Sequence, residues 1–501
     1  MSETQNPDWV QRVQQLKLRT QAFINGQFVP ALSGATFPTL NPATGEITAQ
    51  IARCDVEDVE LAVQAARASF ESGIWADKTP RERKQVLLRL SQLLLENREE
   101  LALLESLDVG KPINDALNID IPGAAGVFAW YAEAADKVYD EVAPTGKHAI
   151  ATITREPVGV VAAVVPWNFP LDMAAWKCAP ALAMGNSVIL KPAEQSPLSA
   201  LFLAELALEA GIPAGVLNVL PGYGVEVGKP LGLHPDVDCL TFTGSTEVGK
   251  YFLTYSGQSN MKMVWLECGG KSPLIVFDDC QQLEKAADLA AFGIFFNQGE
   301  VCSASSRLLV QASIKERFLE LLKIRAQQYQ PANPLNPTAK LGAIVDDKQL
   351  ATVESYIAKG LAEGAQLVTG GQRPDPANVG QGYFIQPTIF DQVTPQMTIA
   401  REEIFGPVLS VMSFEDEAEA LRLANDSIYG LAASVWTDNL KRAHRMAKKL
   451  RAGTVSVNTV DALDPMVPFG GFKQSGFGRD LSLHALDKFS QLKTIWINLE
   501  D

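Results

Sequence analysis

The stretch Val158-Gly159-Val160-Val161-Ala162-Ala163-Val164-Val165 is an uninterrupted apolar run that ends at Pro166. A strand that is covered on both faces of a parallel sheet carries such a run, whereas a half-exposed strand alternates polar and apolar residues. Similar short runs follow at 187–190, 216–220, 240–242 and 263–266. The segments between these runs have helical spacing, which predicts a doubly wound α/β sheet over about 157–266.

The same alternation returns between Glu267 and about Arg479. Predicted strands lie at 272–277, 307–310, 367–368, 408–411 and 454–457, and predicted helices at 283–296, 314–329, 349–363, 416–425 and 440–450. This pattern predicts a second α/β domain over 267–480. The expected fold class is therefore α/β, with two doubly wound domains.

The N-terminal part adds a hairpin and helices. Asn25-Gly26 within 23–29 predicts a tight hairpin turn. Helical spacing between 56 and 105 predicts two helices, the second of which continues through 101–104, and a further helix is expected over 120–139. Ser196, followed by Pro197, predicts the cap of another helix.

Two segments, 148–155 and 492–499, alternate polar and apolar residues and fit neither domain. Such strands either reach out to pair with a partner or form ordinary edges of one protomer.

The composition indicates a globular protein of two or three domains. The chain has 501 residues, of which 47% are hydrophobic and 20% charged. Six cysteines without a CxxC spacing, and only four histidines, argue against a disulfide framework or a metal site and favour a reducing compartment. The net charge of −15 argues against nucleic acid or an anionic membrane as a partner. The polar start at 1–17 shows no signal peptide, and the apolar stretch 157–171 is too short to span a bilayer, so we expect a cytoplasmic protein.

The stretch Asn297-Gln298-Gly299-Glu300-Val301-Cys302-Ser303 presents one cysteine on a polar turn after the apolar run 290–296. A cysteine held in this way attacks carbonyl groups once burial and nearby dipoles have set its pKa. A buried structural thiol is the alternative interpretation. Glu267, at the end of a predicted strand, suits a general base because burial raises a carboxyl pKa. Asn168, in a turn rigidified by Pro166 and Pro170, suits a donor to an oxyanion.

Two other stretches point to a nucleotide. Thr243-Gly244-Ser245-Thr246-Glu247-Val248-Gly249 follows a strand and opens a helix, whose N-terminus can bind phosphate. Lys191-Pro192-Ala193-Glu194 follows another strand, at the sheet edge where nucleotides bind. A carboxylate there accepts hydrogen bonds from ribose and repels a 2′-phosphate, which favours NAD over NADP, unless the two charges form a solvated surface pair. The loop 222–228 is one residue too long for the usual glycine-rich fingerprint.

These motifs together resemble the NAD(P)-dependent aldehyde dehydrogenase superfamily, from about Phe23 to the C-terminus. The matching motifs are Pro166-Trp167-Asn168-Phe169-Pro170, Lys191-Pro192, Phe242-Thr243-Gly244-Ser245, Glu267-Cys268-Gly269-Gly270-Lys271-Ser272-Pro273, Gly299-Glu300-Val301-Cys302, Glu402-Glu403-Ile404-Phe405-Gly406-Pro407-Val408 and Pro468-Phe469-Gly470-Gly471. The resemblance implies NAD-dependent oxidation of an aldehyde to a carboxylic acid.

The resemblance also implies residue roles. Cys302 is then the nucleophile that forms a thiohemiacetal and a thioester, Asn168 completes the oxyanion hole, and Glu267 activates water. The implied dinucleotide-binding residues are Trp167, Lys191, Glu194, Gly224, Gly244, Ser245, Glu403 and Phe405. Lys177 matches a proton-relay lysine whose glutamate partner is here replaced by Asp480, and Cys268 replaces a leucine of the family motif.

The implied domains are an NAD-binding domain at 1–136 and 157–266, a catalytic domain at 267–480, and a β oligomerisation arm at 137–156 and 481–501. A homodimer or homotetramer is therefore expected.

The resemblance is strongest to bacterial ω-amino-aldehyde dehydrogenases of polyamine and arginine catabolism, through 120–125, 259–267 and 482–486. The residues expected along the substrate tunnel are Asp120, Asp172, Asp461, Asp464 and Phe469. Carboxylates at a tunnel mouth favour a cationic aldehyde, unless they are helix caps or solvated. The alternatives are betaine aldehyde or plain aliphatic aldehydes as substrates, a cysteine hydrolase without redox chemistry, or a non-catalytic relative.

Overall fold

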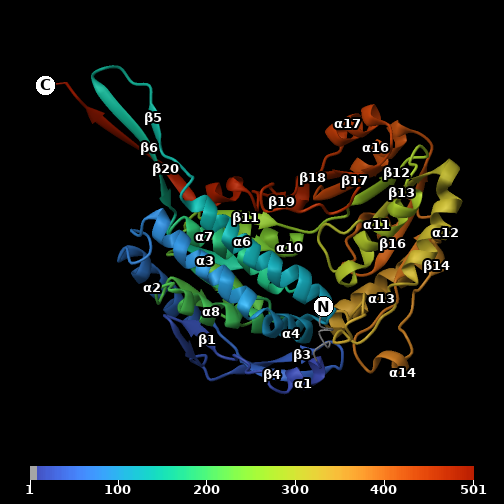
Figure 1. The fold of residues 1–501 in the computed structure, drawn as a ribbon, viewed down its shortest axis with the longest axis horizontal. Helices are drawn as coiled ribbons and strands as arrows, with labels where there is room; N and C mark the ends of the chain where they lie inside the picture. The colour runs from blue at the N-terminus through green and yellow to red at the C-terminus, as the bar shows by residue number, and fades with distance from the viewer. Residues whose placement is uncertain (1–7, 501) are drawn as a thin grey trace, which may run out of the picture.

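The computed structural model describes residues 8–500, so the first seven residues of the polar N-terminal segment and Asp501 lie outside the described range. Figure 1 shows two large α/β units side by side and a narrow β arm that projects from the first of them. The predicted fold class, with two α/β units and a β arm, is confirmed.

The first sheet is built on the five predicted apolar runs. Its parallel centre has the order β11 (Met263–Glu267), β10 (Cys239–Thr243), β7 (Val160–Val164), β8 (Ser187–Lys191) and β9 (Leu217–Val219). At one edge β1 (Ala22–Ile24) and β2 (Gln27–Val29) form the predicted hairpin, and at the other edge β19 (Gly476–Phe477) runs antiparallel to β11.

Strand β7 shows why these runs are apolar throughout. Val161 and Ala163 pack into one core with helices α3 (Pro80–Glu96), α6 (Ile121–Ala135), α7 (Pro170–Ala183) and α8 (Leu198–Ala210). Val160, Ala162 and Val164 pack into another core, with helices α2 (Val56–Glu71) and α10 (Thr246–Gln258). All five side chains are buried, so a polar substitution at any of them would bury a group without a partner.

The expected continuous helix through 101–104 is wrong. Helix α3 ends at Glu96, and α4 (Arg98–Val109) begins after Asn97. The backbone of Asn97 leaves the helical region, with φ −105° and ψ 17°, and its side-chain Nδ2 donates to the carbonyl of Leu93 at 2.9 Å. Asparagine competes in this way with the helical hydrogen bonds and favours an end to the helix.

Ser196 does not cap helix α8, which begins at Leu198 without a local side-chain cap. The backbone N–H of Leu198 instead donates to Oδ2 of Asp108 in α4, at 2.9 Å. A residue distant in sequence therefore supplies the cap.

The second sheet has the order β14 (Gln366–Thr369), β15 (Thr388–Asp391), β16 (Val408–Phe414), β13 (Arg307–Gln311), β12 (Pro273–Val276), β17 (Ala432–Trp436) and β18 (Thr454–Val457). Only the β14–β15 pair is antiparallel among the strand pairs of this sheet within residues 8–500. The helices around it are α11 (Leu283–Phe295), α12 (Lys315–Ala326), α13 (Asp347–Ala362), α16 (Glu417–Asn425) and α17 (Leu440–Lys449). Alternate residues of β12 again enter two different cores: Ile275 lies in one, and Leu274 and Val276 in the other.

The arm consists of β5 (Glu141–Ala143), β6 (Ala149–Pro157) and β20 (Ser490–Asn498) (Figure 1). The two alternating segments pair with each other: β6 and β20 are antiparallel over nine residue pairs, from Ser490 and Pro157 to Asn498 and Ala149. Large apolar side chains remain exposed on the arm, Trp496 by 64% and Val142 by 73%.

The remaining elements are α1 (Trp9–Val13), β3 (Thr36–Asn41), β4 (Glu46–Ala52), α5 (Ile113–Asp115), η1 (Ala116–Asp120), η2 (Gly224–Gly228), α9 (Lys229–Leu233), η3 (Phe296–Gly299), η4 (Ala312–Ile314), α14 (Pro376–Val379), α15 (Thr398–Arg401), η5 (Lys473–Ser475) and η6 (Leu483–Lys488). Every helix within residues 8–500 is too short or too polar to cross a membrane. All six cysteines lie in this range and are free thiols.

Candidate active site

A cavity of about 670 Å³ is lined by both halves of the chain. The cavity lies between two groups of elements. The first group comprises the turn after β7, helix α7 and the ends of β10 and β11. The second group comprises the turn that carries Cys302 and the loops at 403–405 and 461–469. The predicted site residues that line it are Asp120, Trp167, Asn168, Asp172, Gly244, Ser245, Glu267, Cys302, Glu403, Phe405, Asp461, Asp464 and Phe469. Lys177, Lys191, Glu194 and Gly224 do not line this cavity.

Cys302 follows a turn with unusual backbone geometry. Asn297 and Gln298 have positive φ angles of 47° and 58°, which only local compensation makes tolerable. Hydrogen bonds of Asn297 stabilise this backbone geometry: its side-chain Nδ2 donates to the carbonyl oxygens of Asn168 at 3.0 Å and Glu300 at 3.2 Å. A Cβ atom at Gly270 would lie 2.5 Å from the carbonyl oxygen of Cys302. Glycine is therefore required where the loop that follows β11 passes Cys302. Cys302 is thereby held at a fixed place in the wall.

The Cys302 thiol lies among carboxylates. Burial raises its pKa well above the usual value, and the carboxyl groups of Glu267, Asp461 and Glu403 raise it further. The thiol therefore needs a base to remove its proton before it can attack a carbonyl carbon.

Glu267 ends β11 at the cavity and is 5% exposed. Its Oε1 has no hydrogen-bond partner within residues 8–500. Burial raises its pKa to about 8, the neighbouring Asp480 also raises it, and Lys177, Lys488 and Arg479 lower it. A carboxyl group that titrates close to neutral pH suits proton transfer.

Asn168 is buried in the wall, and its Nδ2 donates one hydrogen bond to the carbonyl of Glu300 at 2.9 Å. The amide carries a second hydrogen, which can point at a substrate oxygen.

The walls on the other side of the cavity fit a dinucleotide. Ser245 caps α10, where its Oγ accepts from the backbone N–H of Val248 at 3.2 Å. The free N–H groups of that helix end suit a phosphate. Glu403 Oε1 accepts from the backbone N–H of Gly270 at 3.0 Å, and a Cβ at Gly269 would lie 1.9 Å from Glu403 Oε2. Glycine at 269 therefore leaves this carboxylate free to reach the cavity.

Two aromatic residues complete this wall, whereas Lys191, Glu194 and Gly224 lie outside the lining of the cavity. The rings of Trp167 and Phe405 pack edge to face with centroids 5.2 Å apart. Lys191 lies at the end of β8, where its Nζ donates to the Pro192 carbonyl at 2.8 Å and to Glu194 Oε2 at 3.3 Å. Gly224 begins the π-helical segment η2.

A model of the aldehyde dehydrogenase family matches residues 28–495. The chain belongs to the aldehyde dehydrogenase family. It is an oxidoreductase that oxidises aldehydes with NAD as cofactor.

Individual members of the family match over nearly the whole chain. The enzyme is 54% identical over 492 residues to the NADP/NAD-dependent aldehyde dehydrogenase PuuC of Escherichia coli, with 98% of each chain covered. It is 50% identical over 484 residues to an aminoacetaldehyde dehydrogenase of Pseudomonas aeruginosa, with 96% of each covered. Among solved structures, an indole-3-acetaldehyde dehydrogenase with NAD⁺ is 57% identical with a TM-score of 0.97, and covers 98% of this chain and 99% of its own. The γ-glutamyl-γ-aminobutyraldehyde dehydrogenase of Burkholderia cenocepacia is 55% identical with a TM-score of 0.96, at the same coverage.

The four predicted tunnel carboxylates of this aldehyde dehydrogenase differ in their partners. Asp120 is 2% exposed and forms a salt bridge with the buried Lys111. Asp461 Oδ1 accepts from the Ser303 hydroxyl at 2.6 Å. Asp464 is exposed. Asp120 is therefore already neutralised by a cation of the protein itself.

Asp172 faces no such cation directly. Burial raises its pKa to about 7, Asp120 raises it further, and Lys111 lowers it. A Cβ at Gly123 of α6 would lie 3.3 Å from Asp172 Oδ1, so the glycine keeps the space in front of the carboxylate open. Asp172 is thus a half-buried acidic group of the cavity lining that a ligand can reach.

The sequence analysis missed Lys111, which pairs with the lining residue Asp120 but does not itself line the cavity, and it missed several aromatic lining residues. Lys111 carries no motif, and only the fold brings it to Asp120. The aromatic lining residues Phe169, Trp176, Phe292 and Phe296 form an apolar wall. The four-residue spacing of Phe292 and Phe296 ahead of the cysteine turn is a signal that could have identified them.

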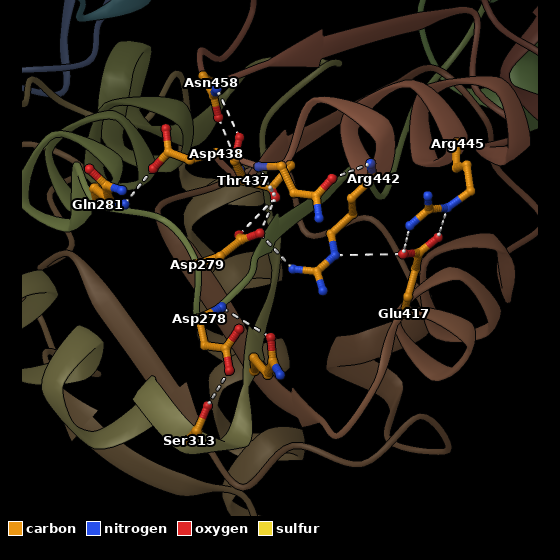
Figure 2. Close-up of polar contacts among 12 residues, drawn as sticks. Asp278, Asp279, Gln281, Ser313, Glu417, Thr437, Asp438, Arg442, Arg445 and Asn458 are labelled. Atoms are coloured by element: carbon orange, nitrogen blue, oxygen red, sulfur yellow. Dashed lines mark hydrogen bonds and ion pairs between the residues drawn. The ribbon is translucent and has the colours of Figure 1, made fainter.

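The loop that carries Asp461 and Asp464 is anchored by a polar network at the end of the second sheet (Figure 2). Thr437 and Asn458 exchange two hydrogen bonds: the Thr437 N–H donates to Asn458 Oδ1 at 3.0 Å, and Asn458 Nδ2 donates to the Thr437 carbonyl at 3.1 Å. The Thr437 hydroxyl donates to Asp279 at 2.7 Å, and Arg442 Nη1 donates to the same carboxylate at 2.9 Å. The start of the tunnel loop is therefore fixed to β12 and β17.

Proposed function

We propose that the enzyme oxidises ω-amino or ω-guanidino aldehydes of polyamine and arginine catabolism to their carboxylic acids. The observation that carries this proposal is Asp172, a half-buried carboxylate on the cavity wall with open space in front of it. A cationic tail would pair with this carboxylate, whereas a neutral tail would leave it desolvated without a partner. The similarity to an aminoacetaldehyde dehydrogenase and a γ-glutamyl-γ-aminobutyraldehyde dehydrogenase supports it.

In the proposed reaction, the Cys302 thiol loses its proton to water in the cavity, and the thiolate attacks the aldehyde carbonyl. The free amide hydrogen of Asn168 and the backbone N–H of Cys302 stabilise the oxyanion of the thiohemiacetal. A bound NAD would supply the hydride acceptor that converts the thiohemiacetal on Cys302 into a thioester. Glu267 then removes a proton from water, which attacks the thioester and releases the acid.

The dinucleotide would lie against Trp167, Lys191, Glu194, Gly224, Gly244, Ser245, Glu403 and Phe405. The carboxylate of Glu194 and its contact with Lys191 support a preference for NAD over NADP. In this proposal, residues 1–136 and 157–266 form the NAD-binding domain and 267–480 the catalytic domain.

The β arm, 137–156 and 481–501, would join protomers into a homodimer or homotetramer in the cytoplasm. Its exposed apolar side chains support an interface. Gel filtration that shows only a species of about 54 kDa would contradict an oligomer.

A second candidate is the oxidation of neutral aliphatic or aromatic aldehydes. The apolar wall of Phe169, Trp176, Phe292 and Phe296 favours it, as does the similarity to an indole-3-acetaldehyde dehydrogenase.

The deciding experiment follows NADH formation from 4-aminobutyraldehyde, 4-guanidinobutyraldehyde, the γ-glutamylated aminoaldehyde, betaine aldehyde, butyraldehyde and indole-3-acetaldehyde. The proposal requires a higher kcat/KM for the amino and guanidino aldehydes. Asp172→Asn should raise their KM by about 30-fold and leave that of butyraldehyde within about threefold. Equal preference for butyraldehyde or indole-3-acetaldehyde by the wild type, with no effect of Asp172→Asn, would overturn it in favour of the second candidate.

A further inference from the structure

A buried charged cluster lies behind the cavity wall at Glu267. Lys177 of α7 and Lys488 of η6 both donate to the carboxylate of Asp480, each to a different oxygen atom. The side chains of Lys177, Lys488 and Asp480 are only 1%, 4% and 0% exposed. Asp480 therefore has both oxygens engaged by ammonium groups, away from solvent.

The backbone places this cluster next to Glu267. Asp480 and Phe469 exchange two backbone hydrogen bonds of 2.8 Å. Gly470 follows Phe469, and a Cβ there would lie 2.7 Å from Glu267 Oε1 and 3.0 Å from Arg479 Cδ. Glu267 also pairs with Gly476 between β11 and β19. The short segment 469–480 therefore contains Asp480 and also contacts the carboxylate of Glu267.

The charges of the cluster determine which form of Glu267 is favoured. Lys177, Lys488 and Asp480 together carry one net positive charge. When Glu267 is ionised, the net charge of the four groups is zero. When Glu267 is protonated, a net charge of plus one remains. Because an uncompensated charge is unfavourable in a buried site, the cluster favours the ionised base.

We propose that Lys488 is a positioning residue for the general base: it holds Asp480 as a carboxylate beside Lys177 and supplies the counter-charge that lets the buried Glu267 lose its proton. The inference rests on the proposed role of Glu267. It also means that Asp480 does not accept the proton of Glu267, because two ammonium groups already occupy its oxygens. The proton leaves Glu267 toward the cavity instead.

The direction of the Asp480 pKa agrees with this geometry. Burial raises the pKa of Asp480, but the contacts with Lys177 and Lys488 outweigh burial and lower it. The other groups that face Glu267 are Arg479 and the thiols of Cys268 and Cys302, and Tyr131 faces Asp480 from α6.

The test isolates the step that needs Glu267. p-Nitrophenyl acetate acylates Cys302 directly and releases p-nitrophenolate, so its turnover requires hydrolysis of the acetyl thioester and no hydride transfer. The acidic limb of kcat against pH then reports the ionisation of Glu267. Lys488→Met should move the midpoint upward by about one pH unit, because the cluster loses a positive charge. Asp480→Asn should move it downward by a similar amount, and the double variant should return it close to the wild-type position.

These opposite shifts separate an electrostatic role from a structural one. A merely structural Lys488 would lower the rate at every pH without moving the midpoint, and this result overturns the inference. Lys493→Met is the matched control, because Lys493 is exposed on β20 and pairs with Glu156. It should leave the midpoint unchanged. If Lys488→Met does not fold, Asp480→Asn decides alone: a downward shift supports the inference, and no shift or an upward shift overturns it.

Failure of the role proposed for Lys488 can be distinguished from failure of the role proposed for Glu267. Loss of ester turnover in Glu267→Gln together with unmoved midpoints in the cluster variants would overturn only the role of Lys488. Full ester turnover in Glu267→Gln would overturn the proposed function of the base.

Discussion

The side-chain amide of Asn168 donates to the backbone carbonyl of Glu300, 2.9 Å away and two residues before Cys302. This bond ties the turn that follows β7 to the turn that presents the cysteine. It uses one amide hydrogen of Asn168 and orients the other. The same contact therefore sets the position of the thiol and the direction of the proposed oxyanion donor.

Asn168→Ala should lower kcat/KM for any aldehyde by about 100- to 1000-fold, because one preorganised donor to the oxyanion is lost. Steady-state NADH formation measures the loss. Thermal unfolding should be followed in parallel, since the bond to Glu300 is lost as well and contributes about 1 kcal/mol. An undiminished kcat/KM in a folded variant would exclude Asn168 from the oxyanion hole.

Glu267→Gln should separate hydride transfer from hydrolysis. The amide cannot accept a proton from water, so steady-state turnover should fall by at least about 100-fold. A rapid burst of about one NADH per active site should remain, because the thioester still forms and then accumulates. Stopped-flow absorbance at the NADH wavelength measures the burst. Its disappearance would show that Glu267 is also needed to activate the Cys302 thiol.

The pH dependence of kcat should follow the carboxylate of Glu267, and that of KM for cationic aldehydes should follow the carboxylate of Asp172. Both have pKa values raised above the usual range, so both lose their charge as the pH falls: Glu267 through about 8 and Asp172 through about 7. As the pH rises, kcat for every aldehyde should therefore increase through about 8, whereas KM should decrease through about 7 only for cationic aldehydes. Butyraldehyde is the internal control. A parallel change of KM for butyraldehyde would contradict a charge interaction at Asp172.

The sequence predicted the sheets because burial on both faces leaves a local signal, as the run at β7 shows. It predicted the residues around Cys302 because they occur in compact motifs, and the structure brings Asn168, Glu267 and Cys302 to one cavity. It failed where a distant residue decides the local outcome. The cap of α8 comes from Asp108, not from Ser196, and the charge of Asp120 is neutralised by Lys111. Neither pairing has a signature in the sequence, since each depends on side chains that meet only after folding.

The anchor of the tunnel loop should affect substrate binding more than chemistry. Thr437→Val keeps the side-chain shape but removes the hydroxyl that donates to Asp279, and so leaves that partly exposed carboxylate with Arg442 alone. The loop that begins at Asn458 should loosen, and KM for 4-aminobutyraldehyde should rise by about three- to tenfold, a cost of roughly 1 kcal/mol, with kcat within about twofold. Ser313→Ala is the matched control, because its hydroxyl donates to Asp278 in the same region at 3.2 Å but does not contact the loop (Figure 2). Equal effects of the two substitutions on KM would mean that general destabilisation, and not the anchor at Thr437, controls the tunnel.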